Sequence, residues 1–215
     1  MDKDEVKLLA RAINLWLQYK KLCGFEHLMG EAMLTLAVAE YLNGQGWRLR
    51  AEQDLLTIAP EMDVSAGCLN FDLCAARGDV NSPPSCIFEL KYLKRPRKGK
   101  GRVAVGSSER VTDDIFKLSY PINPNMKRYL IIAGEKDVEI QGGLRSILTG
   151  SRRTVHVRYE QAASQLEPSF QLSESMAKLA LGREDRPQSI SVECFSEECP
   201  ADSDMHVAIY QVLRA

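Results

Sequence analysis

The 215-residue chain has no stretch of the roughly 18 consecutive apolar residues that a membrane-spanning helix needs. Its first residues carry acidic side chains and lack the apolar core of a secretory signal. Six cysteines are present, but no two of them form a C-x-x-C pair, which argues against a disulfide framework or a zinc site. These absences predict a cytoplasmic protein that has no association with a membrane.

Several catalytic motifs are also missing. The chain has no G-x-x-x-x-G-K-[ST] loop and no G-x-G-x-x-G after a strand, which disfavours nucleotide hydrolysis and dinucleotide redox chemistry. It has no G-x-S-x-G elbow for a serine nucleophile. The three histidines, His27, His156 and His206, form neither H-x-H nor H-E-x-x-H, which disfavours a phosphodiesterase built on histidine–metal ligation.

The composition is that of an ordinary globular protein, with 45% apolar and 27% charged residues, and we expect a single domain over 1–215. The net charge is only −1, yet the stretch from Lys91 to Arg110 is strongly cationic and contains one acid, Glu109. Such a cluster either attracts phosphate groups or is a solvated loop. The candidate nucleic-acid-binding residues in it are Lys94, Arg95, Arg97, Lys98, Lys100 and Arg102.

Two short stretches, 69–76 (LNFDLCAA) and 85–94 (SCIFELKYLK), read as neighbouring strands separated by turn-forming residues. Side chains alternate along a strand, so Glu89 and Lys91 project to the same side as Ile87. Asp72 projects away from the apolar face of the preceding strand. Charges on otherwise apolar strands are costly unless they are paired or bind a metal. If the strands form a hairpin, Asp72, Glu89 and Lys91 converge at one place.

The other elements surround this pair. Apolar spacing predicts helices over about 4–21 and 26–43, a strand starting at Trp47, a helix over 109–119 and a buried strand over 127–133. The first helix has an apolar stripe that we expect to be buried and to include Leu22, and the second helix should be largely buried. Glu31 lies near the start of the second helix, where a carboxylate also favours the positive end of the helix dipole. This order predicts an α/β fold with a mixed β-sheet flanked by helices.

The C-terminal part predicts helices over 137–149 and 173–181 and a strand over 152–159. Strands over 190–195 and 206–213 could pair as a hairpin. The sequence leaves open whether these strands form a dimerisation edge, a substrate-recognition arm or an extension of the sheet.

Glu31 on a helix, Asp72 on a strand, Glu89-Leu90-Lys91 on the next strand and Lys117 on the following helix together resemble the PD-(D/E)XK nuclease superfamily. The resemblance covers about 26–133, preceded by an N-terminal helix over 1–25 and followed by an α+β extension over 134–215. It implies a restriction-endonuclease-like fold. Phe71 stands where the proline of the family motif would precede the aspartate.

The resemblance implies a nuclease, acting as an endo- or exonuclease, that hydrolyses phosphodiester bonds in DNA, with RNA as the second choice of substrate, in defence, mobile-element biology or repair. Asp72, Glu89 and the Leu90 backbone carbonyl would bind Mg²⁺ or Mn²⁺, hard ions that prefer oxygen ligands. Lys91 would orient the attacking water or stabilise the transition state, and Glu31 would support the metal or bind a second ion. Without metal, Asp72 and Glu89 should repel each other and raise at least one pKa.

Some alternatives stay open. Lys117 either contacts a phosphate or is a solvated lysine beside Asp113 and Asp114. Cutting both strands of a duplex often needs two sites, which a homodimer would supply. Finally, the same fold could serve as a catalytically silent module that binds nucleic acid or a protein partner.

Overall fold

A computed structural model of the chain describes residues 1–54, 70–78, 82–93, 105–119, 125–135, 153–158, 169–171, 176 and 187–214. These residues form eight strands, three α-helices and one short 3₁₀ helix. No helix in these ranges is long and apolar enough to cross a membrane. The cationic residues from Lys94 to Arg102 lie outside the described ranges, as does the predicted helix over 137–149.

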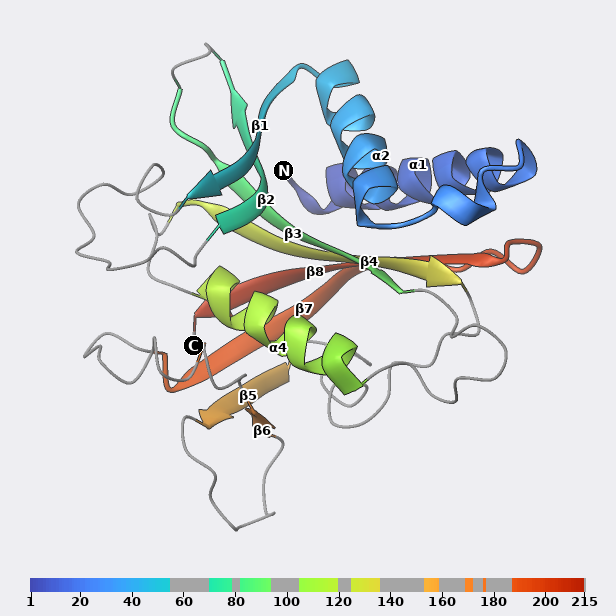
Figure 1. Cartoon of the computed structure of the whole chain (residues 1–215). Helices are drawn as coiled ribbons and strands as arrows, with labels where there is room; N and C mark the ends of the chain where they lie inside the picture. The colour runs from blue at the N-terminus through green and yellow to red at the C-terminus, as the bar shows by residue number, and fades with distance from the viewer. Residues whose placement is uncertain are drawn as a thin grey trace.

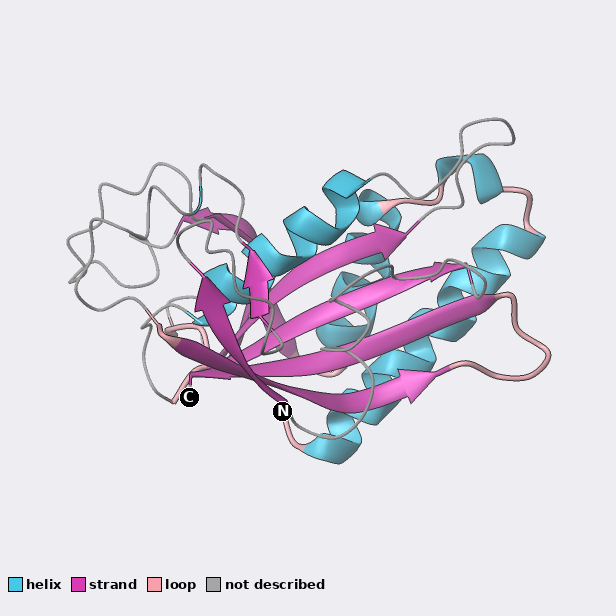
Figure 2. Cartoon of the chain, turned by 90° about the horizontal axis from the view of Figure 1, so that it is seen from below, coloured by secondary structure: helices cyan, strands magenta, loops and turns pink. Residues whose placement is uncertain are grey.

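One eight-stranded sheet has the order β1-β2-β3-β4-β8-β7-β5-β6. Only β3–β4 and β5–β6 are parallel pairs, and the other neighbours are antiparallel. Figure 2 shows the strands running through the molecule as one twisted sheet. The strands are β1 (Trp47–Asp54), β2 (Asn70–Arg77), β3 (Cys86–Leu93), β4 (Lys127–Glu135), β5 (Arg153–Arg158), β6 (Ser169–Gln171), β7 (Ser189–Glu198) and β8 (Met205–Arg214).

Helices cover both faces of the sheet (Figure 1). The helices α1 (Lys3–Leu22) and α2 (Glu31–Gly44), joined by the 3₁₀ helix η1 (Glu26–Leu28), pack on one face. They share a core with β3, β4 and β8 that contains Phe88, Tyr129 and Ile209. The helix α4 (Val105–Ser119) lies on the other face, against β3, β4 and β8. The protein is therefore a mixed α/β fold with a mostly antiparallel sheet flanked by helices.

Both ends of α1 are defined by local chemistry. Asp2 caps the N-terminus by accepting hydrogen bonds from the Asp4 and Glu5 backbone N–H groups, and Glu5 reciprocates as a capping box. Gly24, with φ +83°, ends the helix in a conformation that favours glycine. The buried Asn14 side chain donates to the Glu198 and Met205 carbonyls, which ties α1 to β7 and β8.

The structure confirms the main expectations about the elements. The two central strands form the antiparallel hairpin β2–β3, and the buried strand β4 follows α4 as predicted. The strands β7 and β8 also form the expected hairpin. Of the three roles left open for them, extension of the sheet is confirmed, because β8 pairs directly with β4.

Three expectations about the helices are wrong. The second helix begins at Glu31 instead of residue 26, because the buried Met29 has an extended backbone that interrupts it. This helix buries only one side, and Leu36 on the other is 45% exposed. Leu22 is 87% exposed, since it follows the buried Leu17 by five residues and is rotated by roughly 140° from it.

The remaining differences concern where elements begin. Helix α4 starts at Val105, four residues before the expected residue 109. The short strand β6 was not predicted from the sequence, and β1 is described as far as Asp54.

Candidate active site

The site begins where β2 and β3 stop pairing with each other. Their ladder ends at the pair Leu73–Phe88, so Asp72 and Glu89 occupy the next opposed positions. Beyond the ladder, the Asp72 carboxylate takes the place of a backbone partner and accepts a hydrogen bond from the Leu90 N–H at 2.7 Å. A side chain thus replaces a main-chain contact at the point where the two strands separate, which fixes Asp72 beside β3.

This hydrogen bond also orients the Leu90 carbonyl. In a strand, the N–H and C=O of one residue point to the same neighbour. The Leu90 N–H points toward Asp72 on β2, so its carbonyl oxygen faces the same side. The Leu90 side chain is 1% exposed in the opposite core, which leaves its main chain to define this edge of the site.

Helix α4 covers the site on its face of the sheet with two charged residues one turn apart, Asp114 and Lys117. Lys117 Nζ lies 2.8 Å from Glu89 Oε1 and 3.4 Å from Asp114 Oδ1. It also donates to the Asn70 carbonyl at the start of β2. Lys117 therefore connects α4 with both central strands.

Lys91 forms the second cationic point of the site. Its Nζ lies 3.0 Å from Asp114 Oδ2 and 3.4 Å from Glu31 Oε1. Asp114 thus stands between the two lysines, and Glu31 reaches the cluster from the first turn of α2. The Lys91 side chain is only 14% exposed, whereas that of Glu31 is 57% exposed.

We call this set the charged cluster: Glu31, Asp72, Glu89, Lys91, Asp114 and Lys117. Four carboxylates face two ammonium groups, so the cluster carries an excess of two negative charges when all six are ionised. Burial raises the pKa of Asp72, opposed mainly by the hydrogen bond from Leu90. Burial also raises the pKa of Glu89 well above its usual value, and Lys117 only partly offsets this.

The two lysines respond in the opposite sense. Burial by itself would lower their pKa values, but the surrounding carboxylates outweigh it. Asp114 and Glu31 raise the pKa of Lys91, and Glu89 and Asp114 raise that of Lys117. Both ammonium groups therefore stay charged, whereas the buried carboxylates with raised pKa values bind a proton more readily than exposed ones.

The structure brings together five of the residues singled out in the sequence. Asp72, Glu89 and Lys91 converge as the hairpin predicted, and Glu31 and Lys117 join them. Lys117 is 14% exposed, so the alternative of a solvated lysine is wrong. The expected rise in a carboxylate pKa is confirmed in direction, but its main cause is burial and not mutual repulsion.

Asp114 is the member that sequence reasoning missed. It is 6% exposed and lies on α4 with the buried residues Val111, Ile115 and Leu118. The signal was available, because residues 111, 114, 115 and 118 form one helical stripe. An aspartate within an apolar stripe predicts a carboxylate that faces the sheet.

The chemistry of the cluster suits a hard cation. Glu89 Oε1 and Asp114 Oδ2 are buried and receive no aligned hydrogen bond within the described residues, although an ammonium lies close to each. In the described ranges, no three His, Cys, Asp or Glu side chains are close enough together to hold a metal ion. Magnesium often uses only one or two carboxylates and keeps several waters, so Asp72, Glu89 and the Leu90 carbonyl form an adequate donor set.

Comparison of the chain with family models, curated proteins and solved structures finds no match in any of the three.

Proposed function

We propose that this protein is a metal-dependent nuclease of the PD-(D/E)XK type that hydrolyses phosphodiester bonds in DNA. One observation carries the proposal: Asp72, Glu89 and Lys91 meet on one face of the β2–β3 hairpin, inside a cluster with excess negative charge. Buried charges of this kind are costly, and their concentration around one spot is typical of functional sites.

The arrangement of the elements supports the same assignment. Helix α2 precedes three consecutive antiparallel strands, and α4 then connects β3 to the parallel strand β4. This is the order expected of a restriction-endonuclease-like core, which we propose as the specific fold. In this core, β3 carries two of the charged residues, and α4 supplies the residues that cover them.

The donor set defines where a divalent ion would be held. Asp72, Glu89 and the Leu90 carbonyl would bind Mg²⁺ or Mn²⁺ through oxygen atoms. When bound, such an ion supplies a water of lowered pKa and offsets negative charge on the phosphate. Lys117 balances part of the charge of Glu89, with Lys117 Nζ 2.8 Å from Glu89 Oε1.

Lys91 is the group best suited to act on the reacting phosphate. Its ammonium stays charged and would stabilise the negative charge that develops as the attacking water adds. Asp114 and Glu31 hold this ammonium at 3.0 and 3.4 Å and act as positioning residues. Lys117 remains a candidate phosphate contact.

A catalytically silent module is the second candidate. It is favoured by the ion pairs themselves, because Lys117 with Glu89 and Lys91 with Asp114 already compensate much of the buried charge. In that case the cluster would stabilise a surface that binds nucleic acid or a protein partner. The two candidates differ in one measurable property, which is metal-dependent cleavage.

The test is a nuclease assay on plasmid, linear and single-stranded DNA with Mg²⁺, Mn²⁺ or Ca²⁺. We expect Mg²⁺ or Mn²⁺ to support cleavage and Ca²⁺ to bind without turnover, because its looser coordination positions a water poorly. Asp72→Asn and Lys91→Ala should each lower the rate by roughly 100-fold or more, the typical effect of losing a stabilising charge at the reacting atoms.

Matched controls come from helix α1. Asp4→Asn and Lys7→Ala remove the same kinds of charge from an exposed ion pair and should leave cleavage unchanged. A folded wild-type protein that binds DNA but never cuts it with any of these ions would support the silent module instead.

A further inference from the structure

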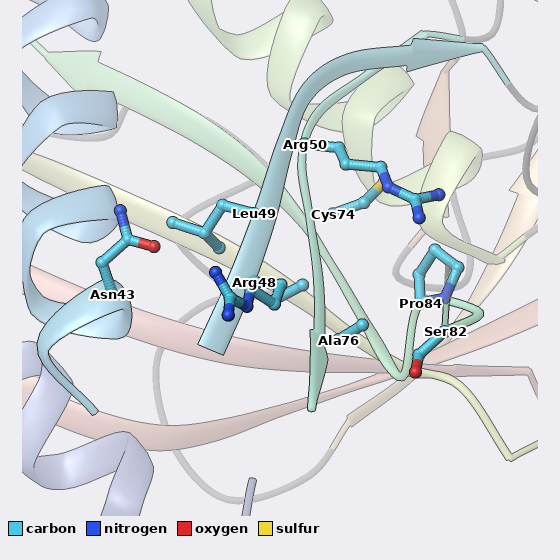
Figure 3. Close-up of a pocket in the computed structure, with 9 residues that line it drawn as sticks. Asn43, Arg48, Leu49, Arg50, Cys74, Ala76, Ser82 and Pro84 are labelled. Carbon is cyan, nitrogen blue, oxygen red and sulfur yellow. The ribbon is translucent and has the colours of Figure 1, made fainter. Parts of the chain in front are cut away.

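A second feature is a pocket of about 270 Å³ at the edge strand β1, with lining residues from both sides of the sheet. It extends from Asn43 at the end of α2 to Ser82 and Pro84 in the loop before β3. Arg48 and Arg50 line it from β1, and Figure 3 shows their guanidinium groups at different ends of the pocket. The charged cluster contributes none of the lining residues.

The register of β1 and β2 explains why there is space here. Arg48 pairs with Ala76, and Arg50 pairs with Cys74. Side chains at paired positions lie on the same face, so two long cationic side chains stand beside two small ones. Leu49 and Ala75 face the opposite side, where they belong to the core under α1 and α2. Alternation thus assigns both arginines to the opposite side of β1 from Leu49, and because β1 is an edge strand the pocket also reaches Asn43 at the end of α2.

The same register connects the pocket to the charged cluster. Cys74 and Asp72 are two residues apart on β2 and therefore project to the same face. Arg50 lies one strand over and two residues along from Asp72, a separation of roughly 8 Å between Cα atoms. Burial, helped by Glu89 and opposed by Arg50, raises the pKa of the Cys74 thiol to about 12. The Cys74 thiol thus interacts electrostatically with both the charged cluster and the pocket.

The lining groups suit a phosphate. Guanidinium groups bind phosphate oxygens through paired hydrogen bonds, and they stay charged at any accessible pH. The Ser82 hydroxyl and the Asn43 amide line the same pocket and can donate further hydrogen bonds. Among the described residues that line the pocket there are two arginines and no carboxylate, so these residues form a cationic site beside an anionic cluster.

We propose that Arg48 and Arg50 form a phosphate-binding subsite for the nucleic-acid strand that is cut at the charged cluster. The inference rests on the proposed function and adds the path that the bound strand follows across the sheet. A strand with one phosphate at Asp72 and Glu89 crosses β2 and places a neighbouring phosphate at Arg50 and the next near Arg48. The contacts are to the backbone, so the subsite fixes the position of the strand without reading its sequence.

The test measures binding separately from cleavage. Fluorescence anisotropy with a short labelled DNA duplex and with a single strand, in EDTA, compares wild type with Arg48→Ala/Arg50→Ala. The expected result is a roughly tenfold or larger loss of affinity, because each contact is a charge-assisted hydrogen bond. The slope of log K against log salt should fall by about 1.8 for a duplex, since each phosphate contact contributes about 0.9.

The control variant is Lys7→Ala/Arg11→Ala, which removes two exposed cations from α1 on the other face. It should keep the affinity and the salt slope of the wild type. Circular dichroism verifies folding of each variant. If the double variant at β1 is unstable, the single substitution Arg48→Gln at an exposed position replaces it, and the salt slope should then fall by about half as much.

Two results would overturn the subsite. The first is an unchanged affinity and slope in a folded arginine variant. The second is a site for free anions only, in which inorganic phosphate stabilises the wild type in an arginine-dependent way while oligonucleotide affinity is unaffected. Failure of the proposed function looks different: the wild type binds DNA through the arginines yet does not cleave it with Mg²⁺ or Mn²⁺.

Discussion

At the scale of single residues, two lysine–aspartate pairs with the same spacing have very different surroundings. Lys117 and Asp114 are one helical turn apart on α4, with side chains 14% and 8% exposed. Lys7 and Asp4 have the same spacing on α1, with side chains 55% and 88% exposed. Both pairs are 3.3–3.4 Å apart, so distance does not distinguish them. The contribution of each pair to stability depends instead on its burial, and Lys117 also forms an ion pair with a second carboxylate, that of Glu89.

Replacing Lys117 by Met should therefore destabilise the metal-free protein by about 3–5 kcal/mol, the usual result of removing one partner from a buried ion pair. The substitution leaves Glu89 and Asp114 buried without their shared ammonium. Urea unfolding at neutral pH measures the change. Lys7→Met should change stability by less than about 0.5 kcal/mol, because an exposed pair contributes little.

Acid separates the two effects of this substitution. If the loss arises from unpaired carboxylates, lowering the pH should restore part of the stability of Lys117→Met, since protonation removes their charge. An equal loss at every pH would show that unpaired carboxylate charge is not the cause of the destabilisation.

The same contrast explains which site residues the sequence could reveal. Asp72, Glu89 and Lys91 were predictable because alternation along a strand assigns each side chain to a face. Asp114 could be recognised only by reading the apolar stripe of α4 as a face directed at the sheet. The partners of Lys91 depend on how α2 and α4 pack across β3, and no local pattern encodes that geometry.

At the scale of elements, the parallel contact between β3 and β4 fixes the position of β3, which carries Glu89 and Lys91. Their register runs from Cys86–Lys127 to Leu93–Gly134 and includes Lys91–Ile132. At the last pair the two backbones approach so closely that a Cβ on Gly134 would lie 2.5 Å from the Leu93 carbonyl oxygen. Leu93 is two residues beyond Lys91 on β3, so a shift of the backbone at Gly134 would also displace Lys91.

Gly134→Ala should consequently lower stability by about 1–3 kcal/mol, as overpacking against an immobile group does. It should also slow the proposed cleavage, because relief of the clash displaces the end of β3. Thermal unfolding and the nuclease assay measure the two effects. Gly44→Ala is the matched control, since a Cβ there meets nothing within 4 Å and alanine favours the helix. A Gly134→Ala protein as stable as the wild type would mean that β3 and β4 can separate without cost.

Element types were more predictable than element limits. The β2–β3 and β7–β8 hairpins followed from alternation and turn residues, and α4 from its apolar spacing. The break between η1 and α2 was missed, although Gly30, a poor helix former, lies at it and is the N-cap of α2. Burial of Met29, which apolar spacing alone does not reveal, helps to fix the break. The order of the strands beyond β4 depends on contacts between segments far apart in sequence, which periodicity does not contain.

At the scale of the whole molecule, a net charge of −1 conceals a separation of charge between two neighbouring regions of the sheet. The cluster at β2 and β3 is anionic, whereas the neighbouring pocket at β1 is cationic. A polyanion alone would be repelled by the cluster and attracted by the pocket. A divalent cation at the cluster would neutralise its excess charge, so that metal and nucleic acid should favour each other's binding.

This charge balance predicts how stability depends on pH and metal. The pKa values of Asp72 and Glu89 are raised above their usual 3.8 and 4.5, mainly by burial. A raised carboxylate pKa contributes stability that is complete below the unfolded value and is lost as the pH rises through the folded value. Mg²⁺ competes with protons for these oxygens, so it should raise the unfolding temperature more at about pH 8 than at about pH 5.

Scanning calorimetry with Mg²⁺, Ca²⁺ or EDTA at both pH values measures this difference. At a free ion concentration of 100 times Kd, mass action adds about 2.7 kcal/mol to the free energy of unfolding. Asp72→Asn should lose most of this gain, whereas Asp4→Asn should retain it. If neither ion changes the unfolding temperature at either pH, the cluster does not bind these ions, and its ion pairs with the two lysines stabilise the fold instead of a metal.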